Sequence, residues 1–100
     1  MRMKKFITKK EIAKAERLLN KLDKIKFGVK LSLNVEAQLI AEYNAKGEET
    51  EAEYRRGKLR GMLSMAEKLG VITFEEKNIL TKYFIDKYVS MTSEIKHSAA

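Results

Sequence analysis

Five cationic side chains recur at a regular spacing near the start of the chain. Successive members of the series are four, three, four and three residues apart: Lys10, Lys14, Arg17, Lys21 and Lys24. At ~100° per residue, this spacing places all five on one face of a helix. No acid lies inside the row. Such a row, here named the basic stripe, suits the phosphates of a nucleic acid or an acidic protein surface. The alternative is a solvated lysine-rich face with no partner.

A second group of cations, here named the basic cluster, lies in the middle of the chain. It consists of Arg55, Arg56, Lys58 and Arg60. These residues point around a helix rather than along one line, so they form a basic half-helix. We expect both groups to make phosphate contacts that position the protein without reading base sequence. Few aromatic residues are interleaved with the basic stripe, which favours duplex or backbone binding over stacking on single strands.

Small residues recur in the same segment as the basic cluster: Gly57, Gly61 and Ser64 are spaced four and three apart. Each glycine inside a helix costs about 1 kcal/mol relative to alanine, so two in one helix need a reason. We expect close approach by another backbone, which could be the fourth helix, a second copy of the chain or a bound partner. A surface that faces a ligand is the alternative.

Charge is distributed along the chain in blocks. The net charge is +7 and the pI is about 9.6. Residues 1–30 carry eleven Lys or Arg against three acids, residues 31–53 carry one Lys against six Glu, and residues 54–100 carry nine against five. This layout indicates a polyanion binder, a self-associating protein or both. Basic and acidic blocks could also pair between copies, so a homo-oligomer is expected.

The chain lacks the residues that most catalytic sites need. It contains no cysteine, one histidine (His97) and two aspartates (Asp23 and Asp86), which leaves no catalytic triad and no histidine-based zinc motif. The glycines do not form a phosphate-binding loop after a strand. The glutamates of residues 48–53 match no calcium loop and fit the start of a helix better. We therefore expect no enzymatic activity, no cofactor, no metal site and no small-molecule substrate.

Helix boundaries are marked by capping signals. Three Thr-x-x-Glu patterns predict capping boxes at helix starts: Thr8 with Glu11, Thr50 with Glu53, and Thr73 with Glu76. Asn34 is expected to cap another helix that runs to about residue 46, and Gly47 and Gly70 are expected to end helices. The helices before Gly70 and after Thr73 are joined by so short a turn that they must form a hairpin.

The segment 27–33 alternates apolar with small or polar residues, which is the period of a half-buried strand. We expect it to be an extended linker or to pair with its copy in a dimer. The predicted fold is an all-α, single-domain, four-helix arrangement built on the C-terminal hairpin. It has a short extended segment after the first helix, and residues 1–7 and 96–100 are expected to be frayed.

Two DNA-binding motifs resemble parts of the chain. A helix-turn-helix around Gly70 would place Glu75 and Glu76 at the head of the recognition helix, where they repel phosphates. The order of segments 27–33, 34–46 and the helix from about residue 51 resembles a ribbon–helix–helix over about a third of the chain. That motif would direct Lys30 and Ser32 to base edges. The chain departs from it by having a helix ahead of the strand and a longer second helix, so we assign no family.

These observations favour a small, basic, non-enzymatic nucleic-acid-binding protein with an accessory or regulatory role, directed to DNA. The alternative is a helical protein-interaction module, an adaptor or small inhibitor of the kind that phages and mobile elements carry. The N-terminal segment lacks the apolar core of a signal peptide, and no apolar run approaches a membrane span. We therefore expect a cytoplasmic protein with no membrane partner.

Overall fold

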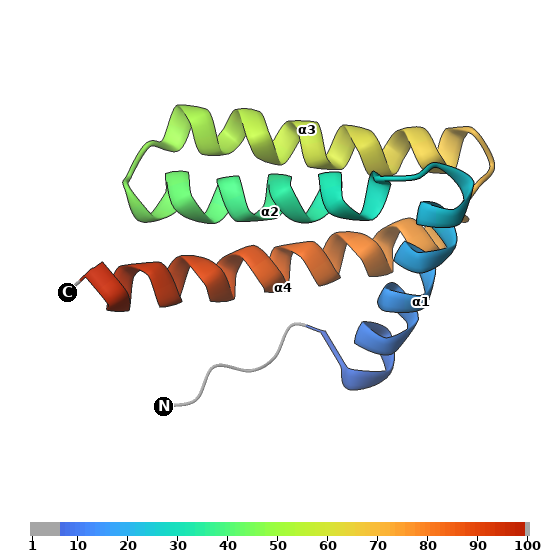
Figure 1. Cartoon of the computed structure of the whole chain (residues 1–100), viewed down its shortest axis with the longest axis horizontal. Helices are drawn as coiled ribbons and strands as arrows, with labels where there is room; N and C mark the ends of the chain where they lie inside the picture. Colours follow the sequence, from blue (N-terminus) through green and yellow to red (C-terminus); the bar gives the residue numbers. More distant parts are fainter. Residues whose placement is uncertain (1–6, 100) are drawn as a thin grey trace.

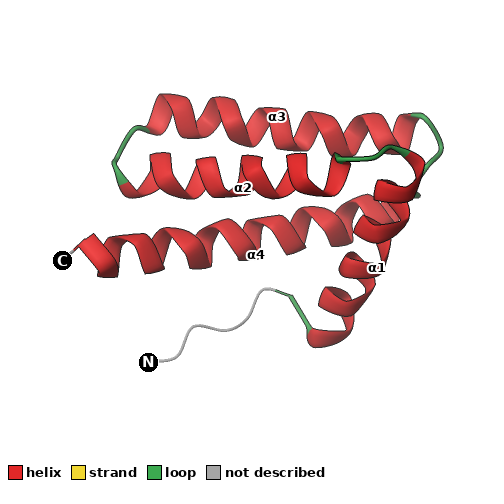
Figure 2. Ribbon diagram, viewed as in Figure 1, coloured by secondary structure: helices red, strands yellow, loops and turns green. Residues whose placement is uncertain are grey.

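Four helices make up the part of the chain that the computed structural model describes, residues 7–99 (Figure 2). They are α1 (Lys9–Ile25), α2 (Val29–Ala45), α3 (Glu49–Lys68) and α4 (Phe74–Ala99). Residues 7–99 contain no strand. The prediction of an all-α, single-domain, four-helix arrangement is confirmed.

Helix α2 is the central element of the fold. It packs against both α3 and α4 along their length, and α1 lies across one end of these three helices (Figure 1). All four helices contribute to one apolar core, in which the largest fully buried side chains are Ile7, Leu19, Leu33, Ile40, Leu63, Leu80 and Phe84. Ile7 was expected in a frayed arm but is buried, while residues 1–6 lie outside the described range. At the other end, residues 96–99 continue α4.

Two of the three predicted capping boxes are present. The Glu11 N–H donates to Thr8 Oγ1 at 3.1 Å, and the Thr8 N–H donates to the Glu11 carboxylate at 3.1 Å. The same reciprocal pair joins Thr73 and Glu76, at 2.9 and 3.1 Å. The box predicted at Thr50 is wrong. Helix α3 begins at Glu49, two residues earlier than expected, so Thr50 lies inside its first turn.

The early start of α3 follows from how α2 ends. Gly47 has a φ of 76°, which is the left-handed conformation that glycine favours. The Glu48 N–H donates back to the Tyr43 carbonyl at 2.9 Å, which closes a Schellman-type turn. Because this turn is so tight, Glu48 already serves as the N-cap residue of α3. Gly70 ends α3 in the same way, with a φ of 75°, and the predicted turn into α4 follows it.

The predicted extended segment 27–33 is wrong. Helix α2 begins at Val29, directly after Gly28, which has a φ of 92°. Asn34 is not a cap; it lies within α2, and its side-chain amide donates to the Lys30 carbonyl at 2.8 Å. The short apolar alternation wrongly indicated a strand. Leu33 also belongs to a helical series that faces the core and that continues with Ala37, Ile40 and Ala41. Because this segment is not a strand, the predicted strand pairing between copies and the ribbon–helix–helix arrangement lose their structural basis.

The capping assignments give a matched pair of variants. Thr73→Ala should lower the free energy of unfolding by about 1 kcal/mol, because it removes the acceptor of the Glu76 N–H. Thr50→Ala should change it by less than about 0.5 kcal/mol, because Thr50 caps nothing. Urea unfolding followed by circular dichroism measures both. An equal loss in the two variants would contradict the assigned start of α3.

Candidate binding surfaces

The basic stripe is exposed along its whole length. All five members lie on the outward face of α1, opposite the buried Ala15, Leu18 and Leu22. Within residues 7–99, no carboxylate lies within ion-pair distance of any of the five. The stripe therefore presents five charges that the described part of the fold does not neutralise.

The acids nearest the stripe are engaged elsewhere. Glu11 accepts from Thr8, and it also binds Lys82 of α4 at 3.0 Å. The backbone hydrogen bond from Thr8, with the contact to Lys82, holds the pKa of Glu11 below its ordinary value. Asp23 accepts the N–H groups of Gly28 and Lys30, both at 3.1 Å, at the start of α2. Two of the three acids in α1 thus serve as caps and ties, which leaves the stripe uncompensated.

The basic cluster is in the opposite situation, because every member contacts a carboxylate. Arg55 lies 3.3 Å from the buried carboxylate of Glu36 in α2, and Lys58 lies 3.5 Å from the same group. The hydrogen bond from Arg55 to Glu36 raises the pKa of the Arg55 guanidinium. These two cations therefore join α3 to α2 at the buried carboxylate of Glu36.

The other two members of the cluster contact acids of α3 itself. Arg56 binds Glu49 at 2.7 Å and Glu53 at 2.6 Å, and Arg60 lies 3.6 Å from Glu53. The hydrogen bond from Arg56 is the main cause of the lowered pKa of Glu53. Arg56 also donates to the Asn44 side chain at 3.2 Å, which joins the start of α3 to the end of α2. Two glutamates of the acidic segment 48–53 thus pair with two members of the basic cluster within one chain.

The two basic groups occupy different regions of the molecule. The stripe runs along α1, across one end of the other helices, whereas the cluster lies in the N-terminal half of α3, toward the opposite end (Figure 1). The nine predicted contact residues therefore do not form one continuous row. Only their arrangement in three dimensions reveals this, because the sequence shows two similar groups of cations.

The two glycines of α3 do not pack against the fourth helix. A Cβ built at Gly57 or Gly61 would meet no atom within 4 Å other than those of its chain neighbours and the adjacent helix backbone, and both residues are exposed. The expectation of close packing by α4 is therefore wrong. Ser64, the third small residue, is half-buried. A second copy or a bound partner against this face stays a prediction.

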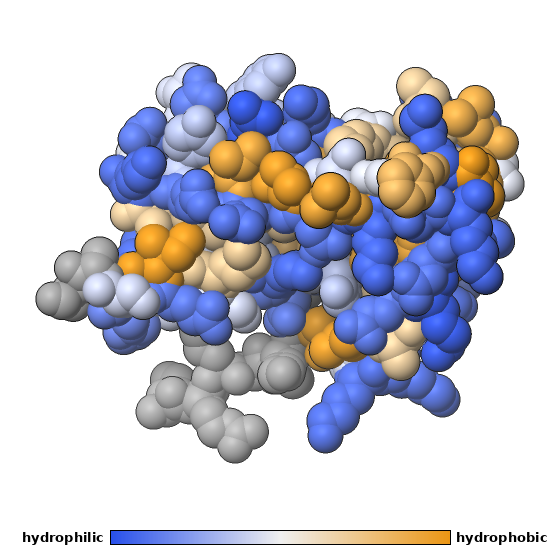
Figure 3. Space-filling view, viewed as in Figure 1, coloured by the Kyte–Doolittle hydropathy of each residue, from blue (hydrophilic) through white to orange (hydrophobic). Residues whose placement is uncertain are grey.

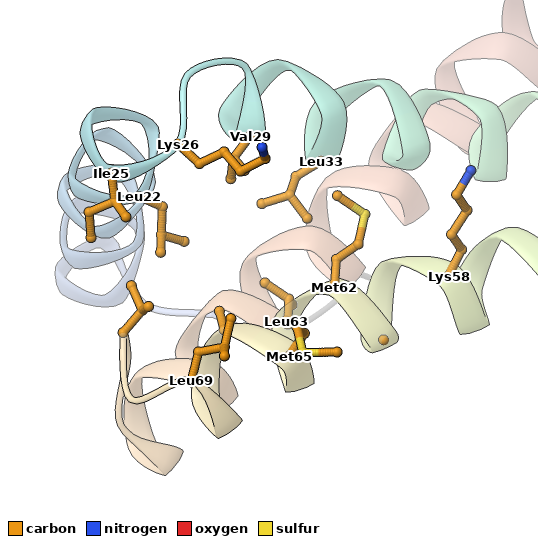
Figure 4. A pocket seen from close by; sticks show the side chains of 13 residues that line it. Leu22, Ile25, Lys26, Val29, Leu33, Lys58, Met62, Leu63, Met65 and Leu69 are labelled. Atoms are coloured by element: carbon orange, nitrogen blue, oxygen red, sulfur yellow. The ribbon is translucent and has the colours of Figure 1, made fainter.

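An apolar groove, which sequence reasoning missed, lies between α1, α2 and α3. It has a volume of about 560 Å³, and Figure 4 shows side chains from all three helices directed toward it. Ile25, Met65 and Leu69 line it and are 56–70% exposed. The signal available in the sequence was the spacing of Gly61, Met65 and Leu69, which puts these three residues on one face of α3.

Further apolar side chains are exposed outside the groove. Phe27 in the α1–α2 turn is 95% exposed, and Leu31 and Val35 follow it at four-residue steps on α2. The space-filling view shows apolar side chains across the middle of one face of the molecule (Figure 3).

No helix among the described residues is long and apolar enough to cross a membrane. Within the same residues, no three His, Cys, Asp or Glu side chains gather as a metal site requires.

The open surroundings of Gly57 give a stability prediction. Gly57→Ala should raise the free energy of unfolding by about 0.5–1 kcal/mol, because alanine removes backbone freedom from the unfolded chain and meets no neighbour. Gly70→Ala is the matched control and should lower it by about 1–2 kcal/mol, because its φ is positive. Thermal and urea unfolding measure both. Destabilisation by Gly57→Ala would show that another backbone packs on this face.

Comparison with known proteins adds no relative: no family model, no curated protein and no solved structure matches the chain.

Proposed function

We propose that the chain binds nucleic acid, directed to duplex DNA, through contacts between the basic stripe of α1 and backbone phosphates. The observation that carries this proposal is that all five stripe cations are exposed and lack a carboxylate partner within residues 7–99. The chain has no enzymatic part in this proposal and acts as an accessory or regulatory binding protein.

The energetics of α1 support a polyanionic partner. Each step along the stripe brings two cations into neighbouring positions on the helix surface, and each such like-charge pair costs about 0.2–0.5 kcal/mol. The four steps from Lys10 to Lys24 therefore oppose helix formation by about 1–2 kcal/mol in total. Phosphates placed along the stripe would remove this repulsion. Two of the three acids of α1, Glu11 and Asp23, hold Lys82 and the start of α2 instead.

The dimensions of the stripe suit a phosphate backbone. At ~1.5 Å per residue, the stripe from Lys10 to Lys24 is about 21 Å long. One DNA strand carries a phosphate every ~3.4 Å along the axis, so the stripe spans roughly six phosphate steps. Lysine and arginine contacts of this kind release counterions and carry no base information. Binding should therefore depend on salt and tolerate many sequences.

The basic cluster has a secondary part in this proposal. Its four cations each contact Glu36, Glu49 or Glu53, and a phosphate would compete with those carboxylates. Lys58 and Arg60 are the more exposed members, and their charges can still attract DNA phosphates at long range. We therefore expect them to assist the approach of DNA more than to anchor it.

A helical protein-interaction module is the second candidate function. The apolar groove between α1, α2 and α3 favours it, because exposed apolar surface of this kind marks interaction sites. The two functions are compatible, since α1 and its C-cap residue line the groove with Leu22, Ile25 and Lys26, and no member of the stripe lines it.

Two double variants test the DNA proposal. Arg17→Gln with Lys21→Gln should weaken binding of a labelled duplex. The slope of log binding constant against log salt concentration should become shallower by about 2, because each lost phosphate contact removes about 0.9 from that slope. Lys58→Gln with Arg60→Gln removes the same net charge and should leave the slope within about 0.5 of the original. Fluorescence anisotropy at several salt concentrations measures both. Charge reversal at Arg17 and Lys21 should abolish binding while the circular dichroism spectrum stays unchanged.

Two outcomes would contradict this assignment. Equal losses in the two neutralised variants would mean that only the total charge matters. Absence of binding by the unaltered chain, even at low salt, would leave the stripe as a solvated face.

A further inference from the structure

We propose that the apolar groove binds an amphipathic helix of another protein, one that carries aliphatic side chains on one face and acidic side chains along its flanks. This site is separate from the basic stripe, and it does not depend on nucleic acid binding. Figure 4 shows its walls: Ile25 and Val29 from the α1–α2 corner face Met65 and Leu69 from α3.

The groove is open to solvent. Ile25, Met65 and Leu69 remain more than half exposed, although apolar groups gain most when they leave water. Gly61 also lines the groove, and apart from its chain neighbours and the adjacent helix backbone no atom lies within 4 Å of where its Cβ would be. A glycine at this position leaves room for a neighbouring backbone. Methionine side chains are flexible and adapt to varied partners, as on other helix-binding surfaces.

The chemistry of the lining selects a helix over an extended peptide. Apart from Lys26 and Lys58, every described residue that lines the groove is apolar or glycine. An extended peptide would leave its own N–H and C=O groups without partners there, and residues 7–99 contain no strand edge to which it could add. A helix satisfies its backbone hydrogen bonds internally and presents side chains at i, i+4 and i+7 to such a groove.

The charge at the groove selects an acidic partner. Lys26 and Lys58 are the charged residues among the described lining, and no acid lines the groove. Lys58 shares the Glu36 carboxylate with Arg55, so its charge is not fully neutralised. A second copy is a poor occupant: the chain carries a net charge of +7, and a twofold pairing of grooves would bring the lysines of both copies together. Glutamates flanking the bound helix would instead complement them.

A designed peptide tests this proposal. The probe is a fluorescein-labelled helix of ~16 residues with leucines along one face and glutamates elsewhere. The counter-probe replaces every glutamate with lysine. We expect anisotropy titrations to show binding of the glutamate peptide and at least ~tenfold weaker binding of the lysine peptide.

Matched variants locate the site. Ile25→Gln with Met65→Gln should lower the affinity for the glutamate peptide at least ~tenfold, because both side chains line the groove. Leu31→Gln with Val35→Gln changes two exposed apolar residues outside the groove and should leave the affinity within ~twofold. All four substitutions are neutral and lie on exposed side chains, so both variants keep the net charge and should keep the fold.

Several results would overturn the proposal. One is that the glutamate peptide does not bind, or that the two double variants lose affinity for it equally. Another is a dimer in sedimentation that Ile25→Gln with Met65→Gln converts to a monomer, because the groove would then hold a second copy. A third is displacement of the peptide by oleate, with oleate binding that the groove variant loses, since the occupant would then be an acyl chain.

Discussion

The corner between α1 and α2 depends on the carboxylate of Asp23. This carboxylate accepts hydrogen bonds from the N–H groups of Gly28 and Lys30, donors at the start of α2 that have no carbonyl partner within the helix. Gly28 makes the corner possible by adopting a φ of 92°. The side chain of Lys30 reaches back to Asn20 of α1 at 2.8 Å, which adds a second tie. Together these contacts turn α1 away from the direction of the other helices.

Both candidate binding surfaces follow from this corner. With α1 across the end of α2, α3 and α4, one face of α1 completes the core and the opposite face points to solvent (Figure 1). The exposed face carries the basic stripe. The corner itself forms one wall of the apolar groove, opposite the C-terminal half of α3. A single capping arrangement thus positions a charged surface and an apolar surface on neighbouring parts of a small domain.

Sequence reasoning succeeded where local chemistry decides the outcome. Thr8 and Thr73 cap helices because each has a glutamate three residues later and an apolar helix behind it, and Gly47 and Gly70 end helices because they reach positive φ. It failed at Thr50, because a tight turn after Gly47 starts α3 earlier. It also failed at residues 27–33, because the N-cap residue of α2 is Gly28 and the side chain that accepts amides at its start is Asp23 of the previous helix.

The candidate surfaces were predictable only in part. The outward direction of the stripe follows from its spacing on a helix whose other face is apolar. The pairing of Arg55 and Lys58 with Glu36 could not be read from the sequence, because these residues lie 19 or more positions apart and meet only when α2 packs on α3. The groove was likewise hidden, since it needs three helices and two turns to form. Contacts between residues that are far apart in the sequence cannot be predicted from local sequence patterns.

The central claim is that α1, and not α3, carries the charges that meet phosphate. The most direct measurement is a set of amide proton–nitrogen correlation spectra recorded while a short DNA duplex is added to the labelled chain. We expect the largest shift changes in α1 between Lys10 and Lys24, with small changes at Arg55–Arg60. Changes centred on Arg55–Arg60, with α1 unaffected, would contradict it.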